Sequence, residues 1–333
     1  MSNHPRAGSR RLAVIICPIL LVASVLFGLN FGAVNIPLRE IWLALAADPA
    51  AQYETIVMNL RLPRILVGLL TGGCLAAAGA LLQGVMRNPL ADPGIIGVTA
   101  GGGLAAVITM VALPQFSYLL PPAAFAGAFI TSILIYLLAW GRETSPLKIV
   151  LAGVAVNALV GAVMNGIMIV YSDRVQSVLP WLSGGLNGRS WHHLNFMAPY
   201  AITGLLLSLF AIRTANLLLL GEDSARSLGG KLELQRLLLI LLAALLAGAA
   251  VSVAGLVGFV GLVVPHAVRL LIGDDYRYLL PVSILGGAAL VVTADTVART
   301  WFDPIELPVG ILLACIGAPF FLYLLRRKQT RFR

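Results

Sequence analysis

The stretch from residue 234 to residue 272, LQRLLLILLAALLAGAAVSVAGLVGFVGLVVPHAVRLLI, decides the fold class of this chain. In its 39 residues only four strongly polar side chains interrupt the apolar run: Gln235, Arg236, His266 and Arg269. A helix crosses a bilayer with about 20 apolar residues, so this run is too long for one crossing and suits two. The glycines of the segment 254–258 favour a break there. The stretch therefore predicts two spans, at about 234–254 and 255–272.

The rest of the chain repeats this apolar pattern. Eight further stretches of similar length are bounded by charges, prolines or glycine clusters: about 12–31, 62–86, 94–113, 119–140, 147–171, 194–219, 279–299 and 306–325. Of the 333 residues, 59% are hydrophobic and 11% are charged, whereas a soluble domain has about 25% charged residues. We therefore expect an all-α polytopic membrane protein in which residues 1–333 form a single bundle of ten transmembrane helices.

The basic residues predict how the bundle is oriented. With ten spans and the amino terminus inside, 17 of the 23 Lys and Arg residues lie on the inner side. The other six are outer arginines: Arg39, Arg61, Arg64, Arg174, Arg189 and Arg299. This bias follows the positive-inside rule, so both termini are expected on the cytoplasmic side. The cations are scattered between apolar runs, and we expect no nucleic-acid partner. The basic residues before the first span resemble a signal sequence, but that span is long for one, so we expect it to be retained.

The sequence also indicates which kinds of chemistry the chain lacks. No acidic residue lies near the middle of a span, where an ion-coupled carrier normally needs a carboxylate. The dipeptide Gly230-Lys231 has neither the first glycine nor the Ser or Thr of a phosphate loop, so we expect no ATP site here. Three cysteines, Cys17, Cys74 and Cys315, are widely spaced inside apolar runs. We expect no catalytic residue, metal site or cofactor, and we interpret the adjacent pair His192 and His193 as facing two directions.

Several motifs occur in order between about residue 60 and residue 325. They are RLPR (61–64), QGVMRNPLADPG (83–94), LAGVA (151–155), WLSGG (181–185), GFVGLVVPH (258–266), ADTVAR (294–299) and ELPVG (306–310). Together they closely resemble the FecCD family of permeases, the membrane subunits of ABC importers for ferric siderophores, haem and cobalamin (vitamin B12). The resemblance covers nearly the whole chain.

The resemblance implies a type II ABC importer permease fold in the bacterial cytoplasmic membrane. It implies four kinds of partner: membrane lipid, a second permease subunit (identical or a sister chain), two cytoplasmic ATP-binding subunits, and a periplasmic or lipid-anchored substrate-binding protein. ATP hydrolysis is then expected on the separate subunit, and this chain is a transport subunit rather than an enzyme. The expected substrate is an iron chelate, first of all a ferric siderophore, with haem or cobalamin as alternatives. Two other classes, an ion-gradient-driven carrier and an intramembrane enzyme, stay open for experiment.

Three outer arginines, Arg61, Arg64 and Arg299, form the first candidate site. In the family, arginines at the matching positions meet glutamates on the two lobes of the binding protein, and a rigid cation cluster can hold such carboxylates. The alternative is snorkelling at the lipid interface or, for Arg299, a pair with Asp295 four residues earlier.

Two inner segments are candidates for coupling and gating. The cytoplasmic loop 220–235 resembles the family's coupling helices, with Glu222, Arg226 and Leu228 as the expected ATPase contacts; an ordinary amphipathic connector is the alternative. Asn88 and Leu90 match the family's inner gate. A second gate element falls near Thr144 to Leu147, where Pro146 departs from the polar residues of some members.

One helical stripe is the candidate translocation path. Asn157, Gly161, Met164, Asn165 and Met168 recur at helical spacing within the span 147–171. Amides and flexible thioethers suit a wall along which a bulky ligand slides, and in the family this helix lines the path between the two subunits. The alternative is that the amides bond to a neighbouring helix.

Overall fold

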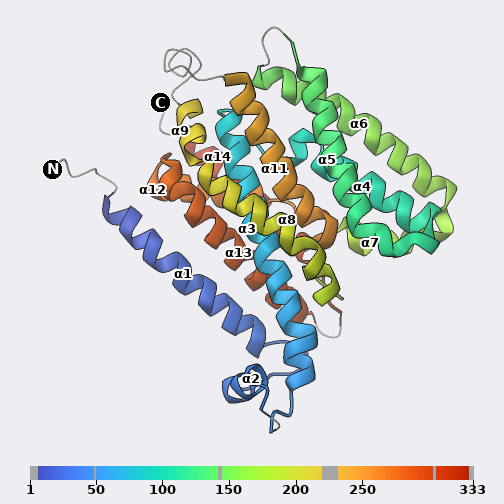
Figure 1. The fold of residues 1–333 in the computed structure, drawn as a ribbon, viewed down its shortest axis with the longest axis vertical. Helices are drawn as coiled ribbons and strands as arrows, with labels where there is room; N and C mark the ends of the chain where they lie inside the picture. Colours follow the sequence, from blue (N-terminus) through green and yellow to red (C-terminus); the bar gives the residue numbers. More distant parts are fainter. Residues whose placement is uncertain (1–6, 49, 142–144, 220–231, 303–304, 330–333) are drawn as a thin grey trace.

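A computed structural model describes residues 7–48, 50–141, 145–219, 232–302 and 305–329. Its α-helices are α1 (Ala7–Asn30), α2 (Leu38–Leu45), α3 (Leu62–Val85), α4 (Val98–Val107), α5 (Leu120–Ala139), α6 (Pro146–Val170), α7 (Val175–Leu182), α8 (Trp191–Phe210), α9 (Ile212–Leu219), α11 (Leu232–Ala254), α12 (Val260–Ile272), α13 (Tyr276–Thr300) and α14 (Val309–Gln329). Short π or 3₁₀ turns join them: η1 (Ile56–Arg61), η2 (Pro93–Ile96), η3 (Ile108–Ala112), η4 (Pro114–Leu119) and η5 (Ser172–Arg174). The described chain is helical throughout its regular structure (Figure 1).

The helices confirm the expected fold class. Seven of them are long and apolar enough to cross a membrane, and three shorter apolar helices cover Val98–Ala112, Val260–Ile272 and Val309–Tyr323. These ten segments correspond one to one with the ten spans expected from the sequence. The 39-residue run does break at its glycines, where Gly255 has φ +72°, a backbone conformation that suits glycine. A left-handed residue ends α11 and lets α12 start in a new direction.

Helix α3 is the central helix of the bundle, and every residue from Thr71 to Val85 is buried. It packs against α11, α12 and α13, which surround it in Figure 1. Close packing there depends on small residues, because a Cβ at Gly72 would overlap the carbonyl of Gly287 and one at Gly79 would overlap the carbonyl of Gly261. Backbones that approach this closely gain dispersion contacts, which replace the hydrophobic driving force that lipid does not provide.

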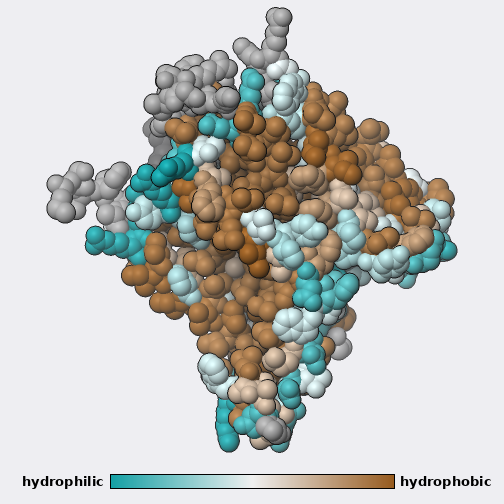
Figure 2. All heavy atoms as spheres, in the orientation of Figure 1, coloured by the Kyte–Doolittle hydropathy of each residue, from teal (hydrophilic) through white to brown (hydrophobic). Residues whose placement is uncertain are grey.

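The outer faces of the bundle are apolar. In Figure 2 hydrophobic side chains cover the middle of the visible face, and hydrophilic ones gather toward the left edge, the lower tip and the lower right. Along α1, Leu12, Ile15, Ile19 and Val22 are each more than half exposed. A continuous exposed apolar strip on a helix of this length is suited to lipid rather than water.

Contacts between distant segments define two ends of the bundle. At one end Arg10, in the first turns of α1, donates a hydrogen bond to the carbonyl of Ile272 at 3.1 Å. At the other end Arg299, near the end of α13, donates to the carbonyl of Gly28. We call the first the inner end and the second the outer end, after the orientation that the Lys and Arg bias predicts. Helix α2 lies at the lower tip of Figure 1, beyond the ends of α1 and α3.

Candidate functional site

Arg64 is the centre of a buried ion-pair network at the outer end. Its Nε donates to Asp295 Oδ2 at 2.8 Å and its Nη2 to Asp295 Oδ1 at 2.9 Å, a two-pronged contact. Its Nη1 reaches Glu306 Oε2 at 2.9 Å. Arg64 and Asp295 are 8% and 4% exposed, while the Glu306 side chain is 38% exposed. The network therefore joins the start of α3, the outer part of α13 and the segment before α14.

Arg61 and Arg299 bind backbone carbonyls instead of carboxylates. Arg61, in η1, donates to the carbonyls of Leu29 and Val34 and, at 2.9 Å, to that of Asn30, which ties down the chain where α1 ends. Arg299 donates to the carbonyl of Gly28, the residue just before Leu29. The two side chains are 4% and 7% exposed.

The structure thus gathers all three predicted docking arginines at one end, but buries them. Asp295 makes its two-pronged contact with Arg64, whereas Arg299, the alternative partner four residues later, donates its hydrogen bond to the carbonyl of Gly28. Neither Arg61 nor Arg64 extends along a lipid face as a snorkelling side chain would, since each is less than a tenth exposed.

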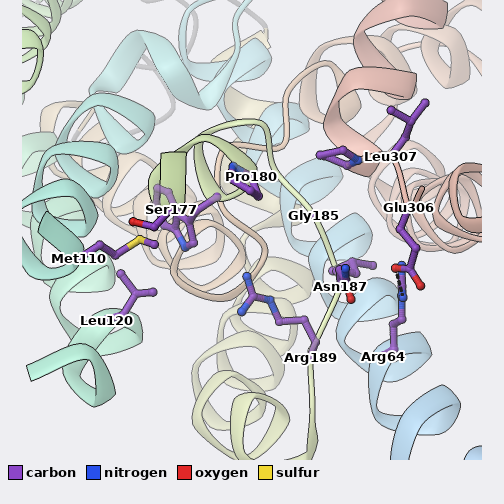
Figure 3. Close-up of a pocket in the computed structure, with 13 residues that line it drawn as sticks. Arg64, Met110, Leu120, Ser177, Pro180, Gly185, Asn187, Arg189, Glu306 and Leu307 are labelled. Atoms are coloured by element: carbon purple, nitrogen blue, oxygen red, sulfur yellow. Dashed lines mark hydrogen bonds and ion pairs between the residues drawn. The ribbon is translucent and has the colours of Figure 1, made fainter. Parts of the chain in front are cut away.

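Two neighbouring cavities at the outer end are lined by these buried arginines. The larger, about 370 Å³, is lined by Arg61, Arg64, Arg189, Arg299 and Glu306, among others. The smaller, about 250 Å³, is shown in Figure 3. Both are lined by Arg64, Asn187, Arg189 and Glu306, so these four residues stand between them. A carboxylate that entered either cavity would meet several guanidinium groups in a partly desolvated space.

Arg189 is a member of this site that the sequence motifs missed. Its Nη1 lies 3.3 Å from Nε2 of His193, whose Nδ1 in turn accepts a hydrogen bond from the Ser190 backbone N–H at 3.3 Å. Burial, together with the nearby charge of Arg64, lowers the pKa of Arg189 to about 10. It was visible in the sequence only as one outer cation among six, because no motif surrounds it.

The predicted path stripe is divided by the fold. Asn157 Nδ2 donates to the carbonyl of Gly94 at 2.9 Å, so this amide bonds within the chain. Met164 and Met168 pack against a cluster of three buried valines: Val107 of α4, Val111 of η3 and Val178 of α7. Gly161 is half-buried with open space beside it, and Asn165 is exposed. Large apolar side chains of α6 are also exposed, among them Leu151, Leu159 and Ile169 at 60%, 66% and 77%.

The inner candidates are only partly described. The Asn88 side chain accepts a hydrogen bond from the Leu90 backbone N–H at 2.9 Å, and both side chains are exposed in the turn between α3 and η2. The predicted coupling residues Glu222, Arg226 and Leu228, and Thr144 of the second gate, lie outside the described residues. The rings of His192 and His193 meet edge to face, with centroids 5.9 Å apart. No group of three His, Cys, Asp or Glu side chains placed to hold a metal ion occurs in the ranges that the structure covers.

The sequence is similar to those of known proteins over nearly the whole chain. The family model of the FecCD transport family matches residues 20–327. The Fe(3+)-citrate import system permease protein YfmE of Bacillus subtilis is 40% identical over 96% of both chains. The cobalamin import system permease protein BtuC of Halobacterium salinarum is 45% identical over 84% of this chain and 75% of its own.

A solved structure has the same fold. A metal-chelate type ABC transporter in an inward-facing conformation superposes with a TM-score of 0.83 at 31% identity, covering 94% of this chain and 98% of its own. The range matched by the family model includes the segments that carry Arg64, Asp295 and Glu306. The chain therefore belongs to the FecCD transport family.

Proposed function

We propose that this chain is the membrane permease subunit of an ATP-driven importer that carries an iron chelate across the bacterial cytoplasmic membrane. The observation that carries the proposal is the 40% identity to a ferric citrate permease over 96% of both chains, together with the matching fold of a metal-chelate transporter. A ferric siderophore is the first substrate to test. Cobalamin is the second, because a cobalamin permease is 45% identical over a shorter stretch. Haem, which the family resemblance also implies, is the third.

The distribution of charge supports an external source of energy. The buried carboxylate of Asp295 lies at the outer end and is neutralised by Arg64, so it does not offer the free mid-membrane acid that a proton-coupled carrier uses. In our proposal two ATP-binding subunits bind at the inner end, where Glu222, Arg226 and Leu228 receive their motion. Asn88 and Leu90, exposed in a turn at the same end, form part of the inner gate.

The outer cavity is proposed as the receptor for an acidic group of the binding protein. Arg61, Arg64 and Arg299 line it together, and Glu306 is the partly exposed carboxylate that is paired with Arg64. An incoming carboxylate can replace Glu306 on Arg64 without leaving a buried charge unpaired. The exposed apolar face of α6 and the exposed Asn165 are proposed to face a second permease subunit across the path.

Transport by the reconstituted complex tests this function. The chain is co-purified with its ATP-binding subunits, placed in proteoliposomes and supplied with the binding protein loaded with ⁵⁵Fe chelates or labelled cobalamin. With the ATP-binding subunits facing the vesicle lumen, we expect uptake to require ATP enclosed in the lumen. Uptake should persist when proton and sodium gradients are collapsed. Uptake driven by a proton gradient without ATP would refute the proposal.

A matched pair of variants tests the docking site. Arg64→Gln should weaken association of the binding protein and reduce its dependence on salt, whereas Arg39→Gln, on the exposed face of α2, should change neither. Equal affinities for the wild type and the two variants would remove Arg64 from the docking site.

A further inference from the structure

The smaller outer cavity has the character of a receptor for a small anion. Its walls are largely apolar, from Met110, Leu120, Trp181, Leu307 and Pro308. In Figure 3 the Arg189 side chain extends across this space toward Ser177 of α7, whereas Arg64 turns toward Glu306. Besides the polar side chains of Ser177 and Asn187, the chamber of about 250 Å³ is lined by two cations, Arg64 and Arg189, and by the carboxylate of Glu306. Because Arg64 is paired with Glu306, Arg189 is the cation of this chamber that has no carboxylate partner among the described residues.

Arg189 is poorly compensated in the described chain. The two carboxylates of the outer network, Asp295 and Glu306, are both bound to Arg64. Arg189 contacts the imidazole of His193, and its Nε is buried with no hydrogen-bond partner in the described chain. A guanidinium has five N–H donors in a planar fork that matches a carboxylate, and most of them are left for a ligand here.

This cavity lies near the proposed translocation path as well as near the outer surface. Met110, on its wall, packs against the same valine cluster as Met164 and Met168 of α6. The cavity therefore lies near the outer part of α6, the helix whose exposed face we propose to line the translocation path. A group bound at Arg189 would lie where a substrate begins its passage.

We propose that Arg189 binds a free carboxylate of the transported chelate in this cavity, which makes the chain selective for anionic, carboxylate-bearing iron chelates. The inference rests on the proposed transport function and specifies its substrate class. A volume of 250 Å³ accepts a carboxylate arm of the chelate and not the whole complex, so the rest of the ligand extends into the path. His193, fixed by Ser190 at the start of α8, acts as the positioning residue that holds the Arg189 fork.

The test compares two chelates on the purified permease in nanodiscs. Ferric citrate is the carboxylate-bearing probe, and ferrichrome, a neutral ferric trihydroxamate, is the control ligand. We expect Arg189→Gln to weaken equilibrium binding of ferric citrate by about tenfold or more, as the loss of a charge-assisted two-pronged contact should. Binding of ferrichrome should not change. Arg189→Lys should weaken the binding of ferric citrate by an intermediate factor, because lysine keeps the positive charge but lacks the planar, two-pronged donor geometry of the guanidinium.

Controls separate this effect from misfolding and from docking. Arg39→Gln removes an outer arginine that lines neither cavity and should leave both affinities unchanged. Arg189→Gln should unfold at the wild-type temperature or higher, because it removes a charge that burial disfavours. Unchanged ferric citrate binding in Arg189→Gln, or no binding of ferric citrate to the wild type, would overturn the inference. So would a loss of affinity for the chelate-free binding protein in Arg189→Gln, since the carboxylate would then come from that protein.

Transport by the same variants keeps the two proposals apart. ATP-dependent ferrichrome uptake that persists in Arg189→Gln, alongside weakened ferric citrate binding, supports both. ATP-dependent uptake with ferric citrate binding unaffected by Arg189→Gln leaves the transport function standing and removes only the selectivity. Absence of ATP-dependent uptake of any chelate refutes the transport function, while the binding comparison still decides whether Arg189 holds a carboxylate.

Discussion

Replacing Asp295 by Asn should destabilise the protein strongly, because Arg64 would keep a buried charge without its main partner. The two groups are joined by two contacts of 2.8 and 2.9 Å, and both residues are more than nine-tenths buried. Removing one partner of a buried pair costs about 3–5 kcal/mol. Glu306 remains but its side chain is 38% exposed, so water screens it and it compensates little. The Asn carboxamide keeps one neutral hydrogen bond, so we expect the low end, about 3 kcal/mol.

The assay is reversible unfolding in mixed micelles of increasing SDS fraction, followed by circular dichroism. The matched control is Asp274→Asn, which breaks an ion pair of 2.6 Å with Arg269 in which the Asp274 side chain is 65% exposed. An exposed pair contributes about 0–1 kcal/mol, so the control should lose at most that. Adding Arg64→Met to Asp295→Asn should cost less than the sum of the single changes, because the orphaned charge is gone. If Asp295→Asn costs no more than Asp274→Asn, the network does not stabilise the outer end as argued.

Three further predictions concern packing, protonation and loop closure. Gly79→Ala should destabilise by about 1–3 kcal/mol in the same assay, since its Cβ would overlap a neighbouring backbone carbonyl, whereas Gly161→Ala, with open space beside it, should be tolerated. Burial raises the pKa of Asp92, so the stability that it contributes is lost as pH rises above the ordinary value of 3.8 through the raised one. Asp92→Asn can still accept a hydrogen bond from the Gly94 N–H. Its thermal stability relative to the wild type should therefore increase as the pH rises above 3.8, and a difference independent of pH would contradict this. Arg61→Gln should leave backbone carbonyls after α1 unpaired and speed trypsin cleavage of the segment 31–40, with unchanged cleavage as the opposing result.

The helical class and the series of ten apolar segments could be predicted from the sequence, because the length and hydrophobicity of a span are local properties. The break within 234–272 is an example, since glycine at 255 has a conformational freedom that is visible without any neighbour. The family resemblance likewise depends on short motifs that are contiguous in the chain.

The partners of the charged groups were decided only by tertiary structure. Arg64 and Asp295 are 231 positions apart, and the nearer candidate, Arg299, bonds to a carbonyl of α1 instead. Helical spacing placed both residues of the expected pair on one face of α13, but in a low-dielectric interior the carboxylate pairs with the guanidinium that packing brings to it in a two-pronged geometry.

The same division explains the path and the outer cavity. Spacing along α6 correctly groups residues on one stripe, but only the neighbouring helices determine that Met164 is covered by the chain itself while Asn165 stays exposed. Arg189 has no motif around it and becomes a candidate only where loops and helix ends from five regions of the chain enclose a space. Hydrophobicity is a property of each residue and can be read from the sequence, whereas a cavity and the charge that lines it form only between segments that folding brings together.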